Sequence, residues 1–183
     1  MAEFTLHDET TAPEGARPAL AAAKRRMGFV TSLNAVMAES PELLAGYNAL
    51  AEQFGKSSLP EPAKHVVLIT TSVLNGCEYC VAAHTTVALK AGVDQAVVEA
   101  LRAGKGLADE ELEEVRALTE SMVTDRGWVS DERVERFLAA GYTKRNLLDV
   151  VLGVGVKTLS NYTNHIAHTP LDPAWADQAW SRD

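Results

Sequence analysis

The chain has 183 residues, 46% of them apolar and 23% charged, which is typical of a globular domain with an ordinary hydrophobic core. Its formal net charge of −8 disfavours nucleic acid and anionic membrane surfaces as partners, because their phosphate groups attract the opposite charge. The longest uninterrupted apolar stretch, residues 150–156, is far shorter than the roughly 18 residues that span a bilayer, so we expect no membrane segment.

Helix signals recur along the whole chain, and no segment shows the alternation typical of a strand. Residues 1–16, rich in Thr, Glu and Pro, predict an irregular N-terminal arm, followed by a single all-helical domain over residues 17–183. Within this domain we expect a short helix over residues 19–27 and a longer one over residues 41–55, with Ser40 as its cap. The sequence therefore predicts an all-α bundle.

The middle of the chain carries clear start and stop signals. A helix opened by Leu59-Pro60-Glu61 should run through Leu74 and stop at Asn75-Gly76, a pair typical of a helix end and turn. The next helix should carry Cys77 in its first turn and end at Gly92. Side chains that favour helix starts precede four further helices, at Asp94, Asp109, Ser130 and Thr143.

The last long helix, over residues 144–168, is apolar nearly all round near its middle, so we expect it to be central and buried. Gly153 and Gly155 within it predict the close approach of a neighbouring helix. Beyond the helix, Trp175 and Trp180 predict an amphipathic C-terminal segment that docks on a neighbouring subunit.

The two halves of the chain echo each other loosely. Each has an amphipathic helix, a glycine-containing loop and a longer apolar helix that ends in a segment with Tyr and His, Tyr79 to His84 in the first half and Tyr162 to His165 in the second. A similarity this short also arises by chance, so two pseudo-twofold-related halves stay open as an alternative to one undivided bundle.

The only two cysteines, Cys77 and Cys80, are three residues apart, and His84 follows four residues later. On a helix these positions form one stripe, and two cysteines so spaced lie within the Cα separation of about 4.4–6.8 Å that a disulfide tolerates. A second thiol can capture a sulfenic acid as a disulfide, which an external dithiol then reduces. The nearby base favours Cys80 as the attacking thiol, whereas the helix dipole favours Cys77.

Other interpretations of these residues are inert core thiols, or a zinc site of Cys77, Cys80, His165 and His168. A thioredoxin-type site is disfavoured because its C-x-x-C follows a strand. We expect a cytoplasmic location, because the first residues lack the pattern of a secretory signal, and there an idle C-x-x-C stays reduced.

The run over residues 74–84, followed by Ala-Gly-Val at 91–93, resembles the core motif of the alkylhydroperoxidase AhpD-like, carboxymuconolactone decarboxylase superfamily. The resemblance covers about residues 55–105, and residues 161–172 resemble a segment of uncharacterised peroxidase-related members. It implies an all-helical AhpD-like subunit, a homo-oligomer (dimer, trimer or hexamer), and thiol-dependent reduction of hydroperoxides. It also implies regeneration by an external dithiol, a dihydrolipoyl-type or thioredoxin-like protein.

By this resemblance Cys80 is the peroxide-reactive thiol, Cys77 its resolving partner and His84 a member of a proton relay. Two positions depart from the family's best-studied relay. His65 stands where the family has a glutamate, and Tyr79 replaces a relay histidine between the cysteines. His65 can shuttle a proton near neutral pH, but it cannot supply the fixed negative charge of a glutamate.

Three further residues are candidates for supporting roles. Glu78 and Tyr79 are placed to line the mouth of the site, and His165 can approach it from the second half, with surface or structural positions as the alternative.

We therefore expect an antioxidant oxidoreductase that reduces a hydroperoxide or a small disulfide. A redox-active Cys77–Cys80 disulfide takes the place of a cofactor, and no metal is expected. A carboxymuconolactone decarboxylase-like lyase, which does not need the dithiol, and a non-enzymatic zinc or interaction module stay open as alternatives.

Overall fold

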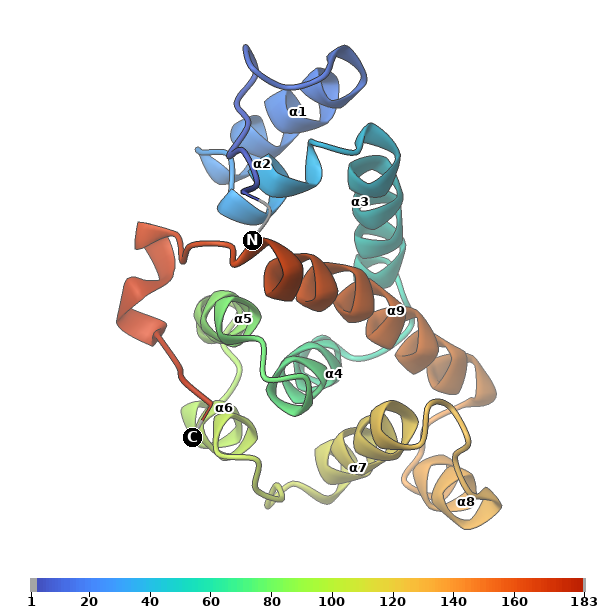
Figure 1. The fold of residues 1–183 in the computed structure, drawn as a ribbon. Coiled ribbons are helices and arrows are strands. Elements are labelled where there is room, and N and C mark those ends of the chain that lie inside the picture. The colour runs from blue at the N-terminus through green and yellow to red at the C-terminus, as the bar shows by residue number, and fades with distance from the viewer. Residues whose placement is uncertain (1–2, 183) are drawn as a thin grey trace.

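The computed structural model describes residues 3–182, and within that range every regular element is helical (Figure 1). The predicted all-α class is confirmed, while residues 1, 2 and 183, at the ends of the predicted arm and domain, lie outside the described range. The elements are η1 (Glu14–Ala16), α1 (Arg17–Met27), α2 (Ser32–Met37), α3 (Pro41–Gly55), α4 (Glu61–Leu74), α5 (Glu78–Lys90), α6 (Gln95–Arg102), α7 (Glu110–Thr124), α8 (Asp131–Ala139), α9 (Lys144–Ala167) and η2 (Pro173–Gln178).

Most helix boundaries fall where the sequence predicts them. The Ser40 hydroxyl accepts a hydrogen bond from the Leu43 amide at the start of α3, and Thr143 forms a reciprocal capping box with Asn146 at the start of α9. Gly28 ends α1 with a positive φ of 85°. Side-chain capping and left-handed turns are local interactions, so short sequence windows predict them well.

Helix α4 lies at the centre of the bundle and contacts α5, α6, α7 and α9 (Figure 1). Its buried face supplies much of the main core, which also takes side chains from α3, α6, α7, α8 and α9. Fully buried members of this core include Val66, Val67, Ile69, Val98, Val115, Leu118, Phe137 and Val150. A smaller second core lies between the N-terminal segment, α2 and α5, and it contains both cysteines.

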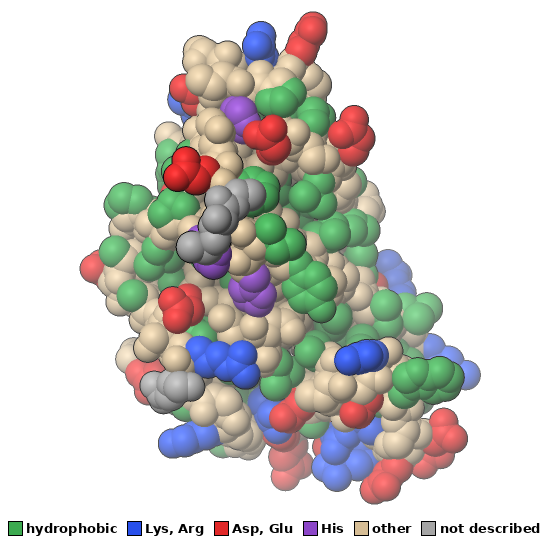
Figure 2. Space-filling view, viewed as in Figure 1, with side chains coloured by type: hydrophobic (Ala, Val, Ile, Leu, Met, Phe, Trp, Pro, Cys, Tyr) green, Lys and Arg blue, Asp and Glu red, His purple; other side chains and the backbone are tan. Residues whose placement is uncertain are grey.

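Helix α9 contacts α2, α3, α4, α5 and α7, so its predicted central position is confirmed. The prediction that it is buried holds only in part, because one strip of the helix leaves apolar side chains in solvent, and Figure 2 shows hydrophobic side chains along the face that α9 crosses. These exposed residues are Leu148, Val151, Tyr162 and Ile166, at 50–67% exposure. The apolar pattern did not distinguish a helix packed on all sides from one that leaves a strip exposed to solvent.

The two glycines of α9 have different surroundings. A Cβ on Gly153 would lie 2.6 Å from Phe54 Cε2 and 2.7 Å from Val67 Cγ1, so α9 approaches α3 and α4 closely at this point. A Cβ on Gly155 would meet nothing within 4 Å. The predicted close approach is confirmed at Gly153 and wrong at Gly155.

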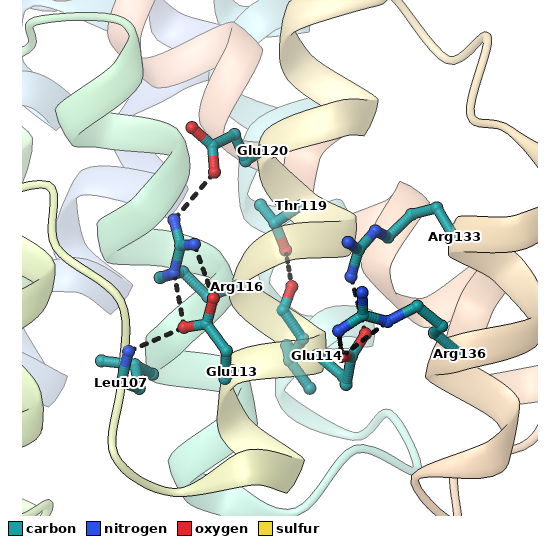
Figure 3. A network of polar contacts seen from close by, with 9 residues as sticks. Leu107, Glu113, Glu114, Arg116, Thr119, Glu120, Arg133 and Arg136 are labelled. Carbon is teal, nitrogen blue, oxygen red and sulfur yellow. Dashed lines mark hydrogen bonds and ion pairs between the residues drawn. The ribbon is translucent and has the colours of Figure 1, made fainter.

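Ion pairs join α8 to α7 at the lower edge of the bundle (Figure 3). Glu114 of α7 accepts hydrogen bonds from Arg133 and Arg136 of α8, each at 2.6 Å. The preceding residue, Glu113, accepts hydrogen bonds from Arg116 on its own helix and from the Leu107 amide in the loop before α7. The two carboxylates therefore fix both the loop before α7 and the helix after it.

The chain termini fold back on the same subunit. Trp175 is buried at 6% exposure, and the Trp180 indole donates to the Arg102 carbonyl at 3.0 Å. Both tryptophans thus pack on their own chain, and docking of this segment on a neighbouring subunit stays a prediction. In the predicted irregular arm, Ala12 and Ala16 are buried in the second core. Across residues 3–182, no helix combines the length and apolar character that crossing a bilayer requires.

Candidate active site

A tight turn places the two cysteines at the start of α5. Gly76 adopts a φ of 65°, a conformation that glycine reaches without strain, and it reverses the chain between α4 and α5. Cys77 follows as the N-cap of α5, so it lies one position before the predicted first turn. Cys80 lies within that first turn, where free backbone N–H groups stabilise a negative charge.

Two polar stripes face each other, one on α5 and one on α9. Each occupies positions i, i+3 and i+7, the spacing of one helix face. The α5 stripe is Cys77, Cys80 and His84, and the α9 stripe is Lys157, Ser160 and Asn164. The contacts run in opposite order along the two helices, as in an antiparallel pair: Asn164 with Cys77 and Cys80, Ser160 with Cys80, and Lys157 with His84.

Both sulfurs contact the same side-chain amide. Asn164 Nδ2 lies 3.2 Å from Cys80 Sγ and 3.6 Å from Cys77 Sγ, while Ser160 Oγ lies 3.8 Å from Cys80 Sγ. Both cysteines are free thiols and almost fully buried, at 1% and 2% exposure. The predicted facing pair of thiols is thus present in the reduced state.

The pKa values of the two thiols are shifted in opposite directions. Burial raises the pKa of Cys80, but a hydrogen bond with Cys77, the Lys157 ammonium and Ser160 together hold that pKa well below its usual range. The pKa of Cys77 is raised by its hydrogen bond with Cys80, by burial and by the charge of Cys80. Since the thiolate is the nucleophile, this asymmetry supports the prediction that Cys80 attacks and Cys77 resolves.

His84 is held as a neutral imidazole. Burial, the Lys157 charge and His65 keep the pKa of His84 well below its usual value. Its Nε2 lies 2.9 Å from Lys157 Nζ, and because a lysine ammonium has only donors, Nε2 must accept this hydrogen bond. The lone pair of that nitrogen is therefore occupied and does not take a proton from Cys80 directly.

A cavity of about 160 Å³ opens beside Cys80 and His84. Its wall is mostly apolar and aromatic, with two cations. Prominent lining residues are Tyr47, Leu33, Tyr79, Trp175, Arg26 and Lys157. A small substrate in this cavity would lie against the thiol whose pKa is lowered.

The Tyr79 hydroxyl is held by structural hydrogen bonds and does not take the place of a proton-relay histidine. Its hydroxyl donates to Asp172 Oδ2 at 2.6 Å and accepts from the Leu33 amide at 3.3 Å. Burial and the Asp172 carboxylate raise the pKa of Tyr79, so it stays protonated near neutral pH. The ring also packs edge-on against Trp175, with centroids 5.2 Å apart. Tyr79 thereby fixes the C-terminal segment as one wall of the cavity.

His65 is buried at 5% exposure on α4, one helix away from the sulfurs. Neither ring nitrogen has a hydrogen-bond partner among the described residues, although Glu61 Oε1 lies 3.6 Å from Nε2. Burial lowers the pKa of His65, and Glu61 partly offsets that shift. His65 influences the pKa of His84, which is its one link to the site.

The remaining predicted residues lie in solvent. Glu78 is exposed at the start of α5, and His165 and His168 are exposed near the end of α9, so none of them lines the cavity. Within residues 3–182 no three side chains of His, Cys, Asp or Glu gather in a way that could hold a metal ion. The zinc site of two cysteines and two histidines is therefore not formed.

The sequence analysis missed the polar stripe of α9. Lys157, Ser160 and Asn164 stand at positions i, i+3 and i+7 in the second half of α9, which is the same spacing as the cysteine stripe. That coincidence of spacing was the available signal. The stripe was overlooked because polar residues on an apolar helix are more often exposed than buried.

Comparisons with known proteins agree with this architecture. The model of the Carboxymuconolactone decarboxylase family matches residues 41–107, which include the dithiol. No curated protein sequence matches the chain significantly. Over residues 41–107 this match supports the sequence-based resemblance to the AhpD-like, carboxymuconolactone decarboxylase superfamily.

Three solved structures illustrate the fold. The alkylhydroperoxidase AhpD core protein of Ralstonia eutropha, an uncharacterised peroxidase-related protein, is 16% identical and has a TM-score of 0.84, covering 94% of this chain and 93% of its own. A peroxidase-related protein from Silicibacter is 18% identical, with a TM-score of 0.78 and 95% of both chains covered. The debrominase Bmp8 in complex with 2,3,4-tribromopyrrole is 15% identical and has a TM-score of 0.79, covering 97% of this chain and 96% of its own. At these identities the similarity shows the fold alone.

Proposed function

We propose that this chain, whose residues 41–107 form a carboxymuconolactone decarboxylase family segment within an AhpD-like fold, is a thiol-dependent peroxidase. The observation that supports this most directly is the asymmetry of the dithiol. Cys80 has a lowered pKa and borders a cavity, while Cys77 has a raised pKa and contacts the same Asn164 amide. One thiol is thus prepared to attack an oxidant and the other to resolve the product.

The reaction proceeds in two steps on the protein. The Cys80 thiolate attacks the terminal oxygen of a hydroperoxide, the O–O bond breaks, and a sulfenic acid and an alkoxide form; the alkoxide takes up one proton. The Cys77 thiol then attacks the Cys80 sulfur, its proton leaves with the hydroxyl group as water, and a Cys77–Cys80 disulfide remains. An external dithiol of the dihydrolipoyl or thioredoxin-like type reduces this disulfide in exchange for its own oxidation.

The test is hydroperoxide consumption with excess dithiol, comparing the full chain with two cysteine variants. Cys80→Ser should abolish turnover. Cys77→Ser should allow a single oxidation and leave a sulfenic acid on Cys80 that dimedone traps. Equal steady-state rates in the wild type and Cys80→Ser would refute the proposal.

A second candidate reaction is reductive debromination of a small aromatic ring. The specific observation in its favour is the cavity of about 160 Å³, whose apolar and aromatic wall includes Tyr47 and Trp175 beside Cys80. In such a reaction the Cys80 thiolate takes the bromine, the ring carbon gains a proton, and Cys77 displaces bromide as the disulfide forms. Bromide release from 2,3,4-tribromopyrrole, measured under the same conditions, distinguishes this activity from hydroperoxide reduction.

The subunit arrangement and location are also proposals. We expect a homo-oligomer, supported by the exposed apolar residues of α9, including Leu148 and Ile166 at 67% exposure each. We expect it in the cytoplasm, where dithiol reductants are abundant. A decarboxylase-like lyase is the less favoured alternative, because its chemistry leaves the paired thiols without a role.

A further inference from the structure

Lys157 is a charged side chain in a place where charges are rare. It is 1% exposed and lies among the largest fully buried side chains of the protein. A buried ammonium without a counterion is strongly destabilising, so it needs an anion nearby. Among residues 3–182, no carboxylate forms an ion pair with Lys157.

The contacts of Lys157 restrict which group can supply the negative charge. Its Nζ lies 2.9 Å from His84 Nε2, which is an uncharged acceptor. One turn further along α9, Ser160 Oγ lies 3.8 Å from Cys80 Sγ, so Lys157 belongs to the stripe that faces the thiols. The other titratable or charged side chains that line the cavity or lie behind it cannot serve as the anion, because they are a cation, a histidine or phenols with raised pKa: Arg26 from α1, Tyr47 from α3, His65 from α4 and Tyr79 from α5. The buried Asp172 carboxylate beyond Tyr79 is bound instead by the Tyr79 hydroxyl and by the amide and hydroxyl of Ser32.

We propose that Lys157 is the counterion of the Cys80 thiolate and the proton donor to the alkoxide that leaves when a hydroperoxide is cleaved. This inference rests on the proposed peroxidase function.

The proton balance of the cycle closes with Lys157 in this role. In the reduced state the pair is a Cys80 thiolate and a Lys157 ammonium. Attack breaks the O–O bond, and the alkoxide takes its proton from Lys157, which is left as a neutral amine. Cys77 and the sulfenic acid then condense to the disulfide and water. When an external dithiol reduces this disulfide, its two protons return to Cys77 and Lys157, which regenerates the starting pair.

His84 has a positioning role in this scheme. Its neutral Nε2 accepts one of the three Lys157 N–H groups at 2.9 Å and so orients the ammonium within the cavity that Cys80 also lines. The favoured substrates are those whose leaving group is an oxyanion in need of a proton, which is the chemistry of hydroperoxides.

The first test measures the thiolate without any peroxide. The rate at which iodoacetamide alkylates Cys80 in the reduced full chain is followed by mass spectrometry as a function of pH, because only the thiolate reacts. Lys157→Met should slow alkylation at least about tenfold near pH 6 and move the midpoint of the alkylation profile to higher pH, so that the difference from the wild type narrows as the pH rises. The control is Lys144→Met, which removes the same charge from the exposed start of the same helix and should change nothing. An unchanged profile in Lys157→Met would overturn the counterion role.

The second test separates charge from proton donation. Lys157→Arg keeps the positive charge but holds its proton at every working pH. Alkylation near pH 6 should therefore stay within about threefold of the wild type, while formation of the sulfenic acid by a hydroperoxide should fall at least about tenfold. If sulfenic acid forms in Lys157→Arg at the wild-type rate, the donor role is overturned. This result stands even if Lys157→Met does not fold.

The outcomes also distinguish this inference from the proposed function. If the wild type consumes no hydroperoxide, the peroxidase proposal and the donor role fail together, while the alkylation profile still decides whether Lys157 stabilises the Cys80 thiolate.

Discussion

The two glycines of α9 offer a paired test of how closely this helix packs. A Cβ on Gly153 would lie 2.6 Å from Phe54 Cε2 and 2.7 Å from Val67 Cγ1, against an ordinary carbon–carbon contact of about 3.5–4.0 Å. The neighbouring side chains would have to move by about 1 Å, and overpacking of this kind costs about 1–3 kcal/mol. Alanine also favours a helix over glycine by about 0.5–1 kcal/mol, so the net loss in the free energy of unfolding for Gly153→Ala should lie between about 0 and 2.5 kcal/mol, centred near about 1 kcal/mol.

Gly155→Ala is the matched control, two residues away on the same helix. Its Cβ meets nothing within 4 Å, so only the helix preference acts and stability should rise by about 0.5–1 kcal/mol. For a chain of this size each kcal/mol shifts Tm by about 2–4 °C, so the two variants should melt several degrees apart, on opposite sides of the wild type. Circular dichroism melts at two protein concentrations measure this difference. A Gly153→Ala variant as stable as Gly155→Ala would refute the close packing of α9 on α3 and α4.

Three further substitutions test the site and the bundle. Asn164→Leu removes the amide donor that contacts both sulfurs, and because a hydrogen bond to a charged group is worth about 1.5–3 kcal/mol, the pKa of Cys80 should rise by about one to two units. Iodoacetamide should then react more slowly than with the wild type at acidic pH and equally fast at alkaline pH. A variant that reacts as fast as the wild type at both pH values would contradict the contact. Asp172→Ala leaves the buried Tyr79 hydroxyl without its acceptor, and urea unfolding should show a loss of about 1–3 kcal/mol, whereas no loss would mean that the C-terminal segment is held elsewhere. Glu114→Gln weakens the ion pairs between α7 and α8 and should cost about 1 kcal/mol in a thermal melt, less at high salt; a loss independent of salt would rule out an ionic origin.

The location of the dithiol and of most helix ends could be predicted from the sequence because they depend on local interactions. Ser40, Asp109, Ser130 and Thr143 cap helices through bonds to residues three positions away, and each cap is present. The C-x-x-C lies at a helix start because the turn at Gly76, also a local feature, comes directly before it. Such features need no knowledge of what packs against the helix.

The state of the dithiol could not be predicted in this way. The spacing of Cys77, Cys80 and His84 indicated a shared stripe, but it left open which thiol attacks, because the base and the helix dipole favoured different sulfurs. The opposite pKa shifts come first from the hydrogen bond between the two thiols, and the pKa of Cys80 is lowered further by Lys157 and Ser160, which lie more than seventy residues away in the chain. His84 was expected to act as a base, yet its Nε2 lone pair is occupied by that lysine.

The sequence by itself determined an all-helical chain and a pair of cysteines at a helix start, because helix periodicity and capping are properties of short windows. Only the tertiary structure decided the chemistry of that pair, since the pKa of a buried thiol is set by the charges and donors that other segments bring to it. Antiparallel packing of α5 against α9 supplies those groups, and the folded-back C-terminal segment closes the cavity beside them. Both arrangements bring together segments that are far apart in the chain, so no short stretch of sequence predicts them.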